Sequence, residues 1–303
     1  MVDVLCIGHA CYDLSVFFSG FPREDSKTET DQLLEAGGGP AANAAYLLSS
    51  WGIGCAFAGL LGDDAFGKKI RAEFAAVGTN VSLVAIRPGY ETPVSLILVN
   101  VENGSRTLVN RKARGANLQI SLHALKTMAP RFLLFDGHQL KASLAALKLF
   151  PKAISILDAG SLREGTSRLA HAVDYLVASE KFALQVCKPG VGLGNAQTRR
   201  HCLGLLQSRY QNPVVITLGE RGLIAHDGRR YYRMPAFATK PVDTTAAGDV
   251  FHGSFVYGLL QGMGFPELLR FASMAASLSV RKRGGRPSIP SLPQVQRALA
   301  HAE

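Results

Sequence analysis

The 303-residue sequence predicts an α/β fold in which helices flank a doubly wound parallel sheet and a small β lid covers one end of it. Short apolar blocks alternate with segments whose apolar residues recur at helical spacing, an order typical of βαβ units. Gly is frequent, with 31 residues, whereas aromatic residues make up only 8%. Such a composition favours close packing of helices on a sheet. A third observation, a group of extended segments that no helix follows, predicts the lid.

The strands and helices are predicted from the first two patterns. Apolar runs predict buried strands at 2–8, 55–61, 132–135, 153–157, 175–178 and 214–218. Helical spacing predicts helices at 41–51, 64–77, 250–260 and 266–280. Parallel strands that alternate with helices bind ligands beyond their carboxyl ends, so we expect the functional site along that edge of the sheet.

The lid is predicted from segments that interrupt this alternation. Residues 93–99 and 107–110 have the pattern of a hairpin around Glu102-Asn103-Gly104, and residues 13–18 and 28–34 are extended as well. We therefore expect the lid strands to come from residues 13–34 and 91–111. Because no internal repeat and no Pro- or Ser-rich linker divides the chain, residues 1–303 are predicted to form a single domain.

The composition limits the class of partner. An apolar fraction of 47% against 18% charged residues excludes a chain that is mainly disordered. The net charge of +10 is compatible with nucleic acid, an anionic membrane surface or small anionic ligands such as phosphates. The basic residues are scattered in groups of two or three, and no nucleic-acid-binding module surrounds them. We therefore expect no nucleic-acid partner.

Cysteines and uncharged segments bear on cellular location. The five cysteines are odd in number and form no C-x-x-C, which predicts reduced thiols, and neither they nor the eight histidines have zinc-ligand spacing. Residues 36–62 carry no charge and could span a membrane by length, but Gly37-Gly38-Gly39-Pro40 indicates a turn in their first part. The N-terminus lacks the basic region of a signal peptide. We expect a soluble, cytoplasmic protein with no membrane partner.

The strongest motif is Asp243-Thr244-Thr245-Ala246-Ala247-Gly248-Asp249, where an extended segment passes into a helix through small residues. Unpaired backbone amides at such a helix start can bind a phosphate, and small side chains let it approach. A carboxylate beside that anion site is unfavourable unless it has a chemical task, such as accepting a proton from an attacking hydroxyl. Taken by itself, the pattern also fits an ordinary helix cap by Thr245.

A second motif is Gly37-Gly38-Gly39-Pro40-Ala41-Ala42-Asn43, which fits either a ligand-binding turn or a tight turn packed on a sheet. In the first case Asn43 could offer its amide to a sugar hydroxyl. Two further glycine-rich stretches are weaker. Residues 59–69 nearly spell a P-loop, but Lys69 replaces the hydroxyl residue that binds magnesium. Residues 190–194 follow a helical stretch, which argues against a dinucleotide fingerprint.

Together these motifs resemble the PfkB/ribokinase family of carbohydrate kinases from end to end. The family's D-T-x-G-A-G-D signature is matched by Asp243 to Asp249, its glycine motif by Gly38, Gly39 and Asn43, and its G-D-D-x-x-G element by Gly62 to Gly67. Residues 217–222 look like the loop over the ATP phosphates. Residues 284–288 resemble the loop beside the nucleotide that often binds a monovalent cation such as K⁺. The resemblance implies a ribokinase-like fold.

The resemblance also implies a function and its residues. An ATP-dependent kinase would transfer a phosphoryl group to a hydroxyl of a sugar or sugar derivative, with ATP, Mg²⁺ and the sugar as its small-molecule partners. Asp249 would be the general base, and the amides of Ala246, Ala247, Gly248 and Asp249 would form the anion hole. The sugar would be bound by Asp13, Gly38, Gly39 and Asn43. The nucleotide would be bound by Thr217, Gly219, Gly222 and Gly285.

The sequence leaves alternatives at the anion hole, at the magnesium shell, in the function and in the oligomeric state. Ala246 stands where the family usually has Gly, which requires a negative φ at that alanine if a methyl group is to be accommodated. The family's N-x-x-E element falls on Ser179 to Phe182, so Glu180 is a substitute candidate for the magnesium shell. A nucleoside kinase of the same family and a catalytically silent sugar-binding regulator remain as alternatives. A flat lid sheet often dimerises in this family, so a homodimer through the lid is possible.

Within the family the chain looks most similar to sulfofructose kinases, which hold the sulfonate with a Lys, an Asn and an Arg. Lys27 and Asn110 match the first two positions, whereas His138 falls at the third. An Arg binds an oxyanion at any ordinary pH, but a His is charged only below about 6.5 unless its pKa is raised. A neutral His138 that bonds a sugar hydroxyl is therefore favoured over a charged one that binds an anion. The sequence predicts a ketose-like sugar or sugar derivative as the substrate.

Overall fold

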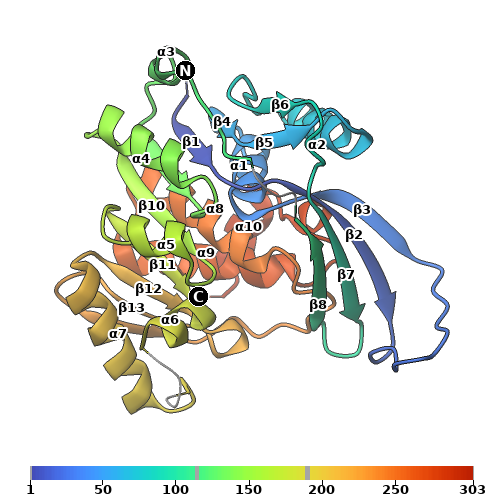
Figure 1. Ribbon diagram of the computed structural model, residues 1–303. Coiled ribbons are helices and arrows are strands. Elements are labelled where there is room, and N and C mark those ends of the chain that lie inside the picture. The colour runs from blue at the N-terminus through green and yellow to red at the C-terminus, as the bar shows by residue number, and fades with distance from the viewer. Residues whose placement is uncertain (1, 113–115, 188–191, 303) are drawn as a thin grey trace.

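The computed structural model describes residues 2–112, 116–187 and 192–302, and it shows a central sheet with helices on both faces and a smaller sheet at one side (Figure 1). The central sheet has the strand order β14-β13-β12-β11-β10-β9-β1-β4. Its strands are β1 (Val4–Ile7), β4 (Cys55–Ala58), β9 (Phe132–Phe135), β10 (Ile154–Ala159), β11 (Tyr175–Ser179), β12 (Val214–Thr217), β13 (Leu223–His226) and β14 (Tyr231–Met234).

The predicted parallel sheet is confirmed from β4 to β12, but its last two strands are antiparallel. β13 and β14 were not predicted, because each is only four residues long and no α-helix separates either from the strand before it; a single 3-10 turn, Gly219–Arg221, precedes β13. The predicted strand at 55–61 is broken at Gly59. Its second half, β5 (Leu60–Gly62), pairs instead with β6 (Ala85–Arg87) in a separate two-stranded sheet.

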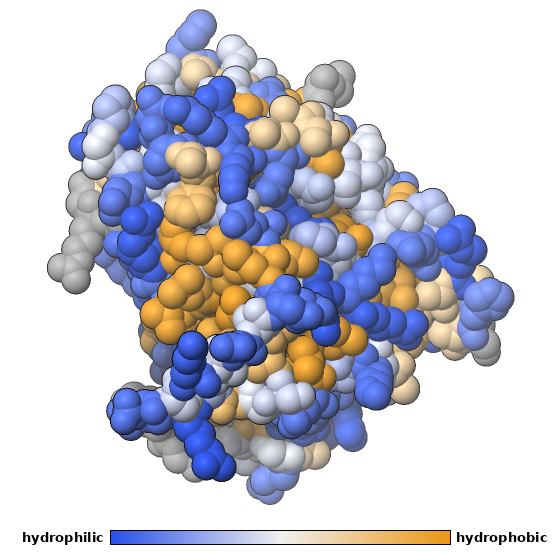
Figure 2. Space-filling model, turned by 90° about the vertical axis from the view of Figure 1, so that its right-hand side faces the viewer, coloured by the Kyte–Doolittle hydropathy of each residue, from blue (hydrophilic) through white to orange (hydrophobic). Residues whose placement is uncertain are grey.

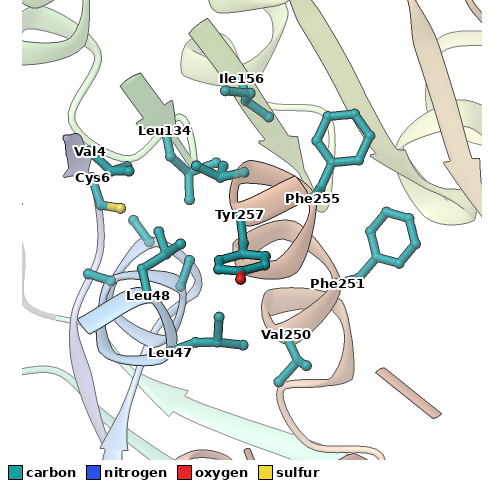
Figure 3. Close-up of a cluster of buried hydrophobic side chains, with 14 of the residues drawn as sticks. Val4, Cys6, Leu47, Leu48, Leu134, Ile156, Val250, Phe251, Phe255 and Tyr257 are labelled. Atoms are coloured by element: carbon teal, nitrogen blue, oxygen red, sulfur yellow. The ribbon is translucent and has the colours of Figure 1, made fainter. Parts of the chain in front are cut away.

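Two apolar cores cover the two faces of the central sheet. One core contains residues of α1 (Pro40–Ser50), α2 (Ala65–Ala76), α8 (Ala247–Leu260), α9 (Phe265–Ser279) and α10 (Leu292–Ala300). The other contains residues of α3 (Leu122–Lys126), α4 (Leu140–Leu149), α5 (Glu164–Leu169), α6 (Glu180–Cys187) and α7 (Ala196–Tyr210). Figure 3 shows the first core, where Leu47 and Phe255 lie with other apolar side chains between the helices and the strands. Full burial of one such side chain contributes about 1.5–3 kcal/mol.

Small residues bring α1 and α8 unusually close. Ala41, Ala42, Ala44 and Ala45 of α1 are all buried, and a Cβ placed on Gly253 of α8 would lie 3.3 Å from the Cα of Ala44. No larger side chain would fit between the two backbones at this point. This approach positions the site, because Asn43 lies on α1 and Asp249 on α8.

The smaller sheet has the order β3-β2-β7-β8 and is formed by β2 (Cys11–Phe18), β3 (Leu33–Gly38), β7 (Val94–Asn100) and β8 (Arg106–Arg111). We call it the small sheet. Its strands come from the regions predicted for the lid, with two differences. Residues 28–32 form no strand, and β3 extends to Gly38, so Gly37 and Gly38 belong to a strand and not to the predicted turn. The turn begins at Gly39, whose φ is 101°.

The two faces of the small sheet differ in character. Asp13 pairs with Ser95, and Ser95 with Asn110, so these polar residues share one face. Leu14, Leu96 and Val109 form the next row and therefore lie on the opposite face, where Leu96 and Val109 are about half exposed, at 48% and 56%. Figure 2, which views the molecule from the side of the small sheet, shows apolar surface on this flank.

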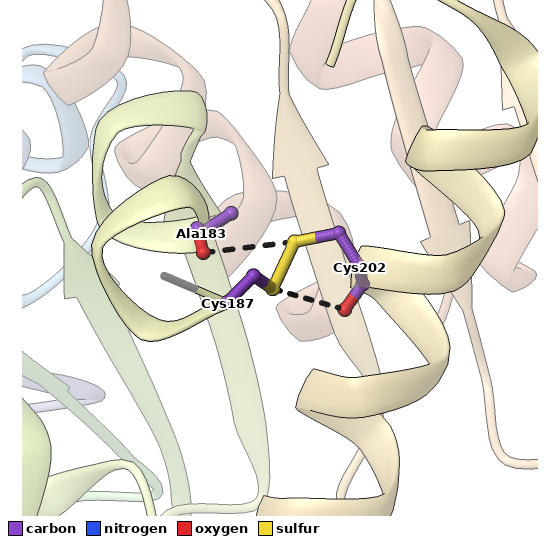
Figure 4. The surroundings of a disulfide bond; sticks show 3 residues. All are labelled: Ala183, Cys187 and Cys202. Atoms are coloured by element: carbon purple, nitrogen blue, oxygen red, sulfur yellow. Dashed lines mark hydrogen bonds between the residues drawn. A yellow bond between two sulfur atoms is a disulfide. The ribbon is translucent and has the colours of Figure 1, made fainter. Parts of the chain in front are cut away.

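The prediction of reduced cysteines was wrong for one pair. A disulfide joins Cys187 at the end of α6 to Cys202 in α7 (Figure 4). The prediction of reduced thiols relied on the absence of C-x-x-C spacing. These two cysteines are 15 residues apart in the sequence, and the packing of α6 against α7 brings their Cα atoms to within 6.0 Å. Cys6, Cys11 and Cys55 are free thiols.

Across the described ranges, every helix is too short or too polar to cross a membrane.

Candidate functional site

The predicted base, Asp249, lies in the first turn of α8, at the edge of the sheet where the carboxyl ends of the strands meet. The loop before it is held by Asp243, which is fully buried. Its Oδ1 accepts a hydrogen bond from the amide of Thr245 and its Oδ2 one from the amide of Gly284, both at 2.8 Å. Within the described residues the amides of Gly248 and Asp249 donate to no backbone group outside the helix, and Gly248 is exposed. These amides are therefore available to an anion.

Ala246 caps α8 in a conformation that the sequence analysis did not expect. Its φ is 60°, in the left-handed region, so the expected negative φ was wrong. Ala246 stands between the buried Thr245 and the first residue of the helix, and a glycine would adopt this conformation without strain. For an alanine the left-handed conformation costs about 1–2 kcal/mol.

Asn43 is oriented toward Asp249 by a chain of polar contacts. The Nδ2 of Asn43 donates to Oδ2 of Asp249 at 2.7 Å, and its Oδ1 accepts from Nε of Arg286 at 3.3 Å. The buried Arg286 in turn pairs with Glu73 at 2.7 Å, and Glu73 accepts from the amide of Gly37. Because Arg286 occupies the amide oxygen, the NH₂ group of Asn43 must face the carboxylate.

Burial and neighbouring charge adjust the acidity of the site. Burial raises the pKa of Asp249 to about 7, and the nearby Asp158 adds to the rise, whereas the bond from Asn43 opposes it. Burial likewise raises the pKa of Asp158, in β10, to about 8. His252, one turn along α8, lies 3.2 Å from Asp158, and burial lowers its pKa. A carboxyl group with a pKa near 7 suits a general base that works at neutral pH.

The glycine motif forms a close-fitting wall beside Asp13. A Cβ on Gly38 would lie 2.1 Å from a carboxylate oxygen of Asp13, and one on Gly39 would lie 2.4 Å from the carbonyl oxygen of His9. Both positions therefore exclude any side chain. Burial raises the pKa of Asp13 above its usual value. Asn110 lies on the same face of the small sheet as Asp13 and is exposed.

The hairpin between β7 and β8 contacts the Asp243–Asp249 loop. The amide and the hydroxyl of Thr244 both donate to the carbonyl of Gly104, at 3.1 and 2.9 Å, and Nη1 of Arg106 donates to the same hydroxyl at 2.7 Å. The charge of Arg106 also lowers the pKa of Asp249. Arg106 was not among the predicted site residues. Arg106 lies between the predicted turn and the predicted strand 107–110, and nothing in the sequence there indicates a contact 138 residues away.

Lys27 and His138, which were both considered as ligands for an anionic group of the substrate, lie in different environments. Lys27 is in the loop between β2 and β3, its side chain is 89% exposed, and its ammonium lies 3.8 Å from Glu29. Among the described residues no hydrogen bond or ion pair joins it to another predicted site residue. His138, in contrast, lies at the carboxyl end of β9, and its ring nitrogens face Nη1 of Arg163. Arg163 was also missed, although it follows the predicted strand 153–157 at the edge where ligands bind.

The predicted nucleotide loop follows β12. Thr217 ends that strand, and Gly219 and Gly222 have φ values of 62° and 83°. A Cβ on Gly222 would lie 2.0 Å from the carbonyl oxygen of Met234, whereas one on Gly219 would meet open space. Gly285 lies against the anion loop, since its Cβ would be 3.4 Å from that of Ala246. The nucleotide and anion loops thus belong to the same edge of the sheet.

The side chains near the nucleotide loop bear on how a magnesium ion could be held. Among the described residues no three His, Cys, Asp or Glu side chains lie close enough to hold a metal ion. Glu180 begins α6 and pairs with Arg221, and the hydroxyl of Ser179 bonds to the carbonyl of Gly160. These residues form no site for a bare ion. They are compatible with magnesium held mainly by nucleotide phosphates and water, with Glu180 nearby.

Residues 1–292 match the family model described as "pfkB family carbohydrate kinase". The chain belongs to the pfkB family of carbohydrate kinases. It is accordingly a phosphotransferase that acts on a sugar hydroxyl.

Individual members of the pfkB family align over nearly the whole chain. The ribokinase of Haemophilus influenzae is 26% identical, covering 88% of each chain, and the 5-dehydro-2-deoxygluconokinase of Shouchella clausii is 27% identical, covering 97% of this chain and 94% of its own. A putative ribokinase structure from Agrobacterium tumefaciens superimposes with a TM-score of 0.87 at 25% identity, covering 99% and 98%. The Arabidopsis thaliana ribokinase structure, complexed with ribose and ATP, gives a TM-score of 0.80 at 23% identity, covering 99% of each chain. The ribokinase-like fold is confirmed.

Proposed function

We propose that this kinase transfers the γ-phosphoryl group of ATP to a hydroxyl of a ketose-like sugar or sugar derivative, with Asp249 as the general base. The observation that carries this proposal is the position of Asp249. Its carboxyl group, with a pKa near 7, lies in the same helical turn as the unpaired amides of the anion loop. A hydroxyl bound there would have a proton acceptor on one side and donors for the transferred phosphoryl group on the other.

The protein's own residues would position the sugar, accept the proton of its hydroxyl and stabilise the charge on the transferred phosphoryl group. Asp13, Gly38, Gly39, Asn43 and Asn110 would bind the sugar. Asp249 would take the proton from the attacking hydroxyl while the amides of Ala246, Ala247, Gly248 and Asp249 donate to the oxygens of the transferred group, where negative charge develops. In-line transfer needs the attacking hydroxyl and the departing ADP on opposite sides of the transferred phosphorus, so that the new O–P bond forms as the bond to ADP breaks. The arrangement of the glycine motif and the nucleotide loop supports this geometry.

The nucleotide is proposed to lie along Thr217, Gly219, Gly222 and Gly285, with its phosphates directed toward the anion loop. Magnesium, when bound with the nucleotide, would neutralise phosphate charge.

A monovalent cation such as K⁺ near Gly284 and Gly285 is proposed on the family resemblance. A higher turnover in KCl than in choline chloride would support it. A cytoplasmic location is part of the same proposal, since ATP is abundant there.

The small sheet is proposed to act as the lid and to mediate a homodimer. Its contacts with Thr244 would keep water away from the phosphates, which favours transfer to the sugar over hydrolysis.

The face of the small sheet opposite Asp13 carries the exposed Leu96 and Val109, and such a face is commonly covered by a partner. Light scattering on the wild type and on Val109→Lys tests the dimer.

A screen for ADP release tests the proposed function. The panel contains neutral ketoses and aldoses, sugar acids and nucleosides, each with ATP and magnesium. Phosphorylation of a sugar supports the proposal. Turnover of nucleosides alone favours a nucleoside kinase, and sugar binding without ADP release favours a silent regulator. Neither alternative has a specific contact in its favour, and the intact Asp249 and anion loop argue against the regulator.

A further inference from the structure

We propose that His252 is a positioning residue for phosphoryl transfer, whose ring holds the peptide group between Gly248 and Asp249 in the orientation that binds the transferred phosphoryl group. The proposal rests on the proposed sugar kinase function and deepens it, because it explains how the anion loop is held on the central sheet. His252 touches neither substrate in this proposal. It acts through the backbone of the anion loop.

The ring of His252 contacts three elements of the fold. Nδ1 lies within hydrogen-bond distance of the carbonyl oxygen of Gly248, one turn back on α8, and 3.2 Å from Oδ2 of Asp158 in β10. Nε2 lies 3.2 Å from the carbonyl oxygen of Val177 in β11. Because β10 and β11 are neighbours in the central sheet, the ring joins the first turn of α8 to two adjacent strands.

A polar ring at this place in α8 is unfavourable unless its hydrogen bonds are used. Every residue of α8 from Val250 to Gly258 is buried, and His252 is only 4% exposed. A side chain that merely filled this space would be apolar, like the nearby Phe251 and Phe255, because burying a polar group without partners costs free energy. The contacts of the ring therefore give a physical reason for a histidine at this position.

Nδ1 is the ring nitrogen that donates to the anion loop. It faces two oxygens, those of Gly248 and Asp158, whereas Nε2 faces only that of Val177. Burial lowers the pKa of His252, so the ring is neutral at physiological pH and has a single N–H. That hydrogen serves two acceptors if it is on Nδ1. A protonated ring would have hydrogens on both nitrogens, so Nδ1 donates to Gly248 in either charge state.

The carbonyl of Gly248 and the amide of Asp249 belong to the same peptide group. A carbonyl oxygen has two lone pairs, so it can accept from the ring as well as from an amide of the helix. A hydrogen bond to the carbonyl polarises the peptide group and makes its N–H a stronger donor. The amide of Asp249 is one of the donors proposed for the anion hole, and the contacts of the ring with β10 and β11 restrict the direction in which it points. His252 thereby strengthens and orients a donor at the place where negative charge develops in the transition state.

Two amide substitutions that differ in reach test the inference by steady-state kinetics. His252→Asn places an amide nitrogen near the position of Nδ1 and keeps a donor for Gly248, whereas His252→Gln places it near Nε2 and reaches only Val177. His252→Gln should lower kcat by about tenfold, with less than about a threefold change in the KM of ATP or sugar, because a transition-state donor is weakened. His252→Asn should keep at least about half of kcat. The control is Ser254→Ala, which should change neither parameter, since Ser254 is buried on the same helix and its hydroxyl has no hydrogen-bond partner among the described residues.

Calorimetric binding of ADP and magnesium, with and without aluminium fluoride, separates this inference from the proposed function. Aluminium fluoride bound beside ADP mimics the phosphoryl group in transfer. If fluoride tightens ADP binding in the wild type and in His252→Asn but not in His252→Gln, the inference is supported even when no sugar on the panel is phosphorylated, in which case the proposed function fails by itself.

Three results overturn the inference. The first is a folded His252→Gln variant with the kcat and the fluoride effect of the wild type. The second is a His252→Asn variant that is folded by circular dichroism but has lost the fluoride effect, or whose KM is raised for both substrates, since a structural role would then explain the loss. The third is a wild type whose ADP affinity fluoride leaves unchanged, which also contradicts the anion hole.

Discussion

The side-chain amide of Asn43 donates a hydrogen bond to Oδ2 of Asp249 across 2.7 Å, and thereby joins the first turns of α1 and α8. The contact is possible because alanines and Gly253 let the two helices approach closely. It favours the ionised form of Asp249, whereas burial and Asp158 disfavour that form. The balance leaves a carboxyl group whose pKa is about 7, and the five predictions that follow all concern this edge of the sheet.

Asp249→Asn should lower kcat by at least about 100-fold, because the amide cannot accept the proton of the attacking hydroxyl. The substitution is nearly isosteric, and the new side chain can still accept from Asn43 through its oxygen, so the fold and nucleotide binding should be retained. Stopped assays of ADP release, together with calorimetric ATP binding and circular dichroism, measure these effects. Near-normal turnover by a folded variant would remove Asp249 from the mechanism.

The pH dependence of kcat/KM should follow the ionisation of Asp249. Since the base acts in its deprotonated form and its pKa is raised to about 7, the rate should rise about tenfold from pH 6 to pH 8 and then level off. Asp158, whose pKa is raised to about 8, gains its negative charge within this pH range and thereby holds the pKa of Asp249 up. Asp158→Asn removes that charge, so the inflection should sharpen and move to lower pH. Asp174→Asn, at the opposite end of the sheet beside Ser155, is the matched control and should leave the inflection unchanged. An inflection that stays in place in both variants would contradict the coupling of Asp158 to Asp249.

Arg286→Lys should impair catalysis through Asn43. A lysine keeps a positive charge beside Glu73 but lacks the Nε donor that fixes the amide oxygen of Asn43. Asn43 would then bond to Asp249 for a smaller fraction of the time, so kcat should fall by about tenfold and the pH inflection should move upward. The KM for ATP should change less than twofold. A fall in kcat with an unchanged pH profile would indicate a structural role for Arg286 that does not act through Asp249.

The sequence predicted the elements and motifs more fully than the contacts between them. Apolar runs indicated the parallel strands because each strand is buried on both faces. The signature before α8 drew attention to Asp249 because small residues at a helix start let a phosphate approach the free backbone amides. Neither pattern could place Arg106 against Thr244 or Arg163 against His138. Both contacts join segments that are far apart in the sequence. A single arginine outside a motif is predicted to be a solvent-exposed surface residue.

The predictions that were wrong failed because a tertiary contact was not visible in the local sequence. Gly37 and Gly38 read as a turn because glycine is common in turns, but here they end a strand where Asp13 and Arg286 leave no room for a Cβ. The Cys187–Cys202 bond depends on how two helices pack, which local spacing does not reveal. In each case a tertiary contact decided the local structure.

Gly219→Val should raise the KM for ATP far more than the KM for the sugar. A Cβ at Gly219 meets open space, so the side chain would project into the region proposed for the phosphates without striking the protein. The φ of 62° is also unfavourable for a β-branched residue. Gly228→Val is the matched control, because Gly228 has a φ of 93° and equally open surroundings but lies in the turn between β13 and β14. Equal effects of Gly219→Val on both substrates would point to general misfolding.

Ala246→Gly should stabilise the protein. The alanine adopts a φ of 60°, which costs it about 1–2 kcal/mol, whereas glycine adopts this conformation freely. Glycine also gains freedom in the unfolded chain, which offsets about 0.4–1 kcal/mol of that relief. The net gain should therefore be about 0.5–1 kcal/mol, measured by urea unfolding. Ala247→Gly, one residue later in the first helical position, has no strain to relieve and should be neutral or destabilising. If Ala246→Gly destabilises the protein as much as Ala247→Gly does, the methyl group of Ala246 contributes packing, against Gly285 and its neighbours, that outweighs the backbone strain.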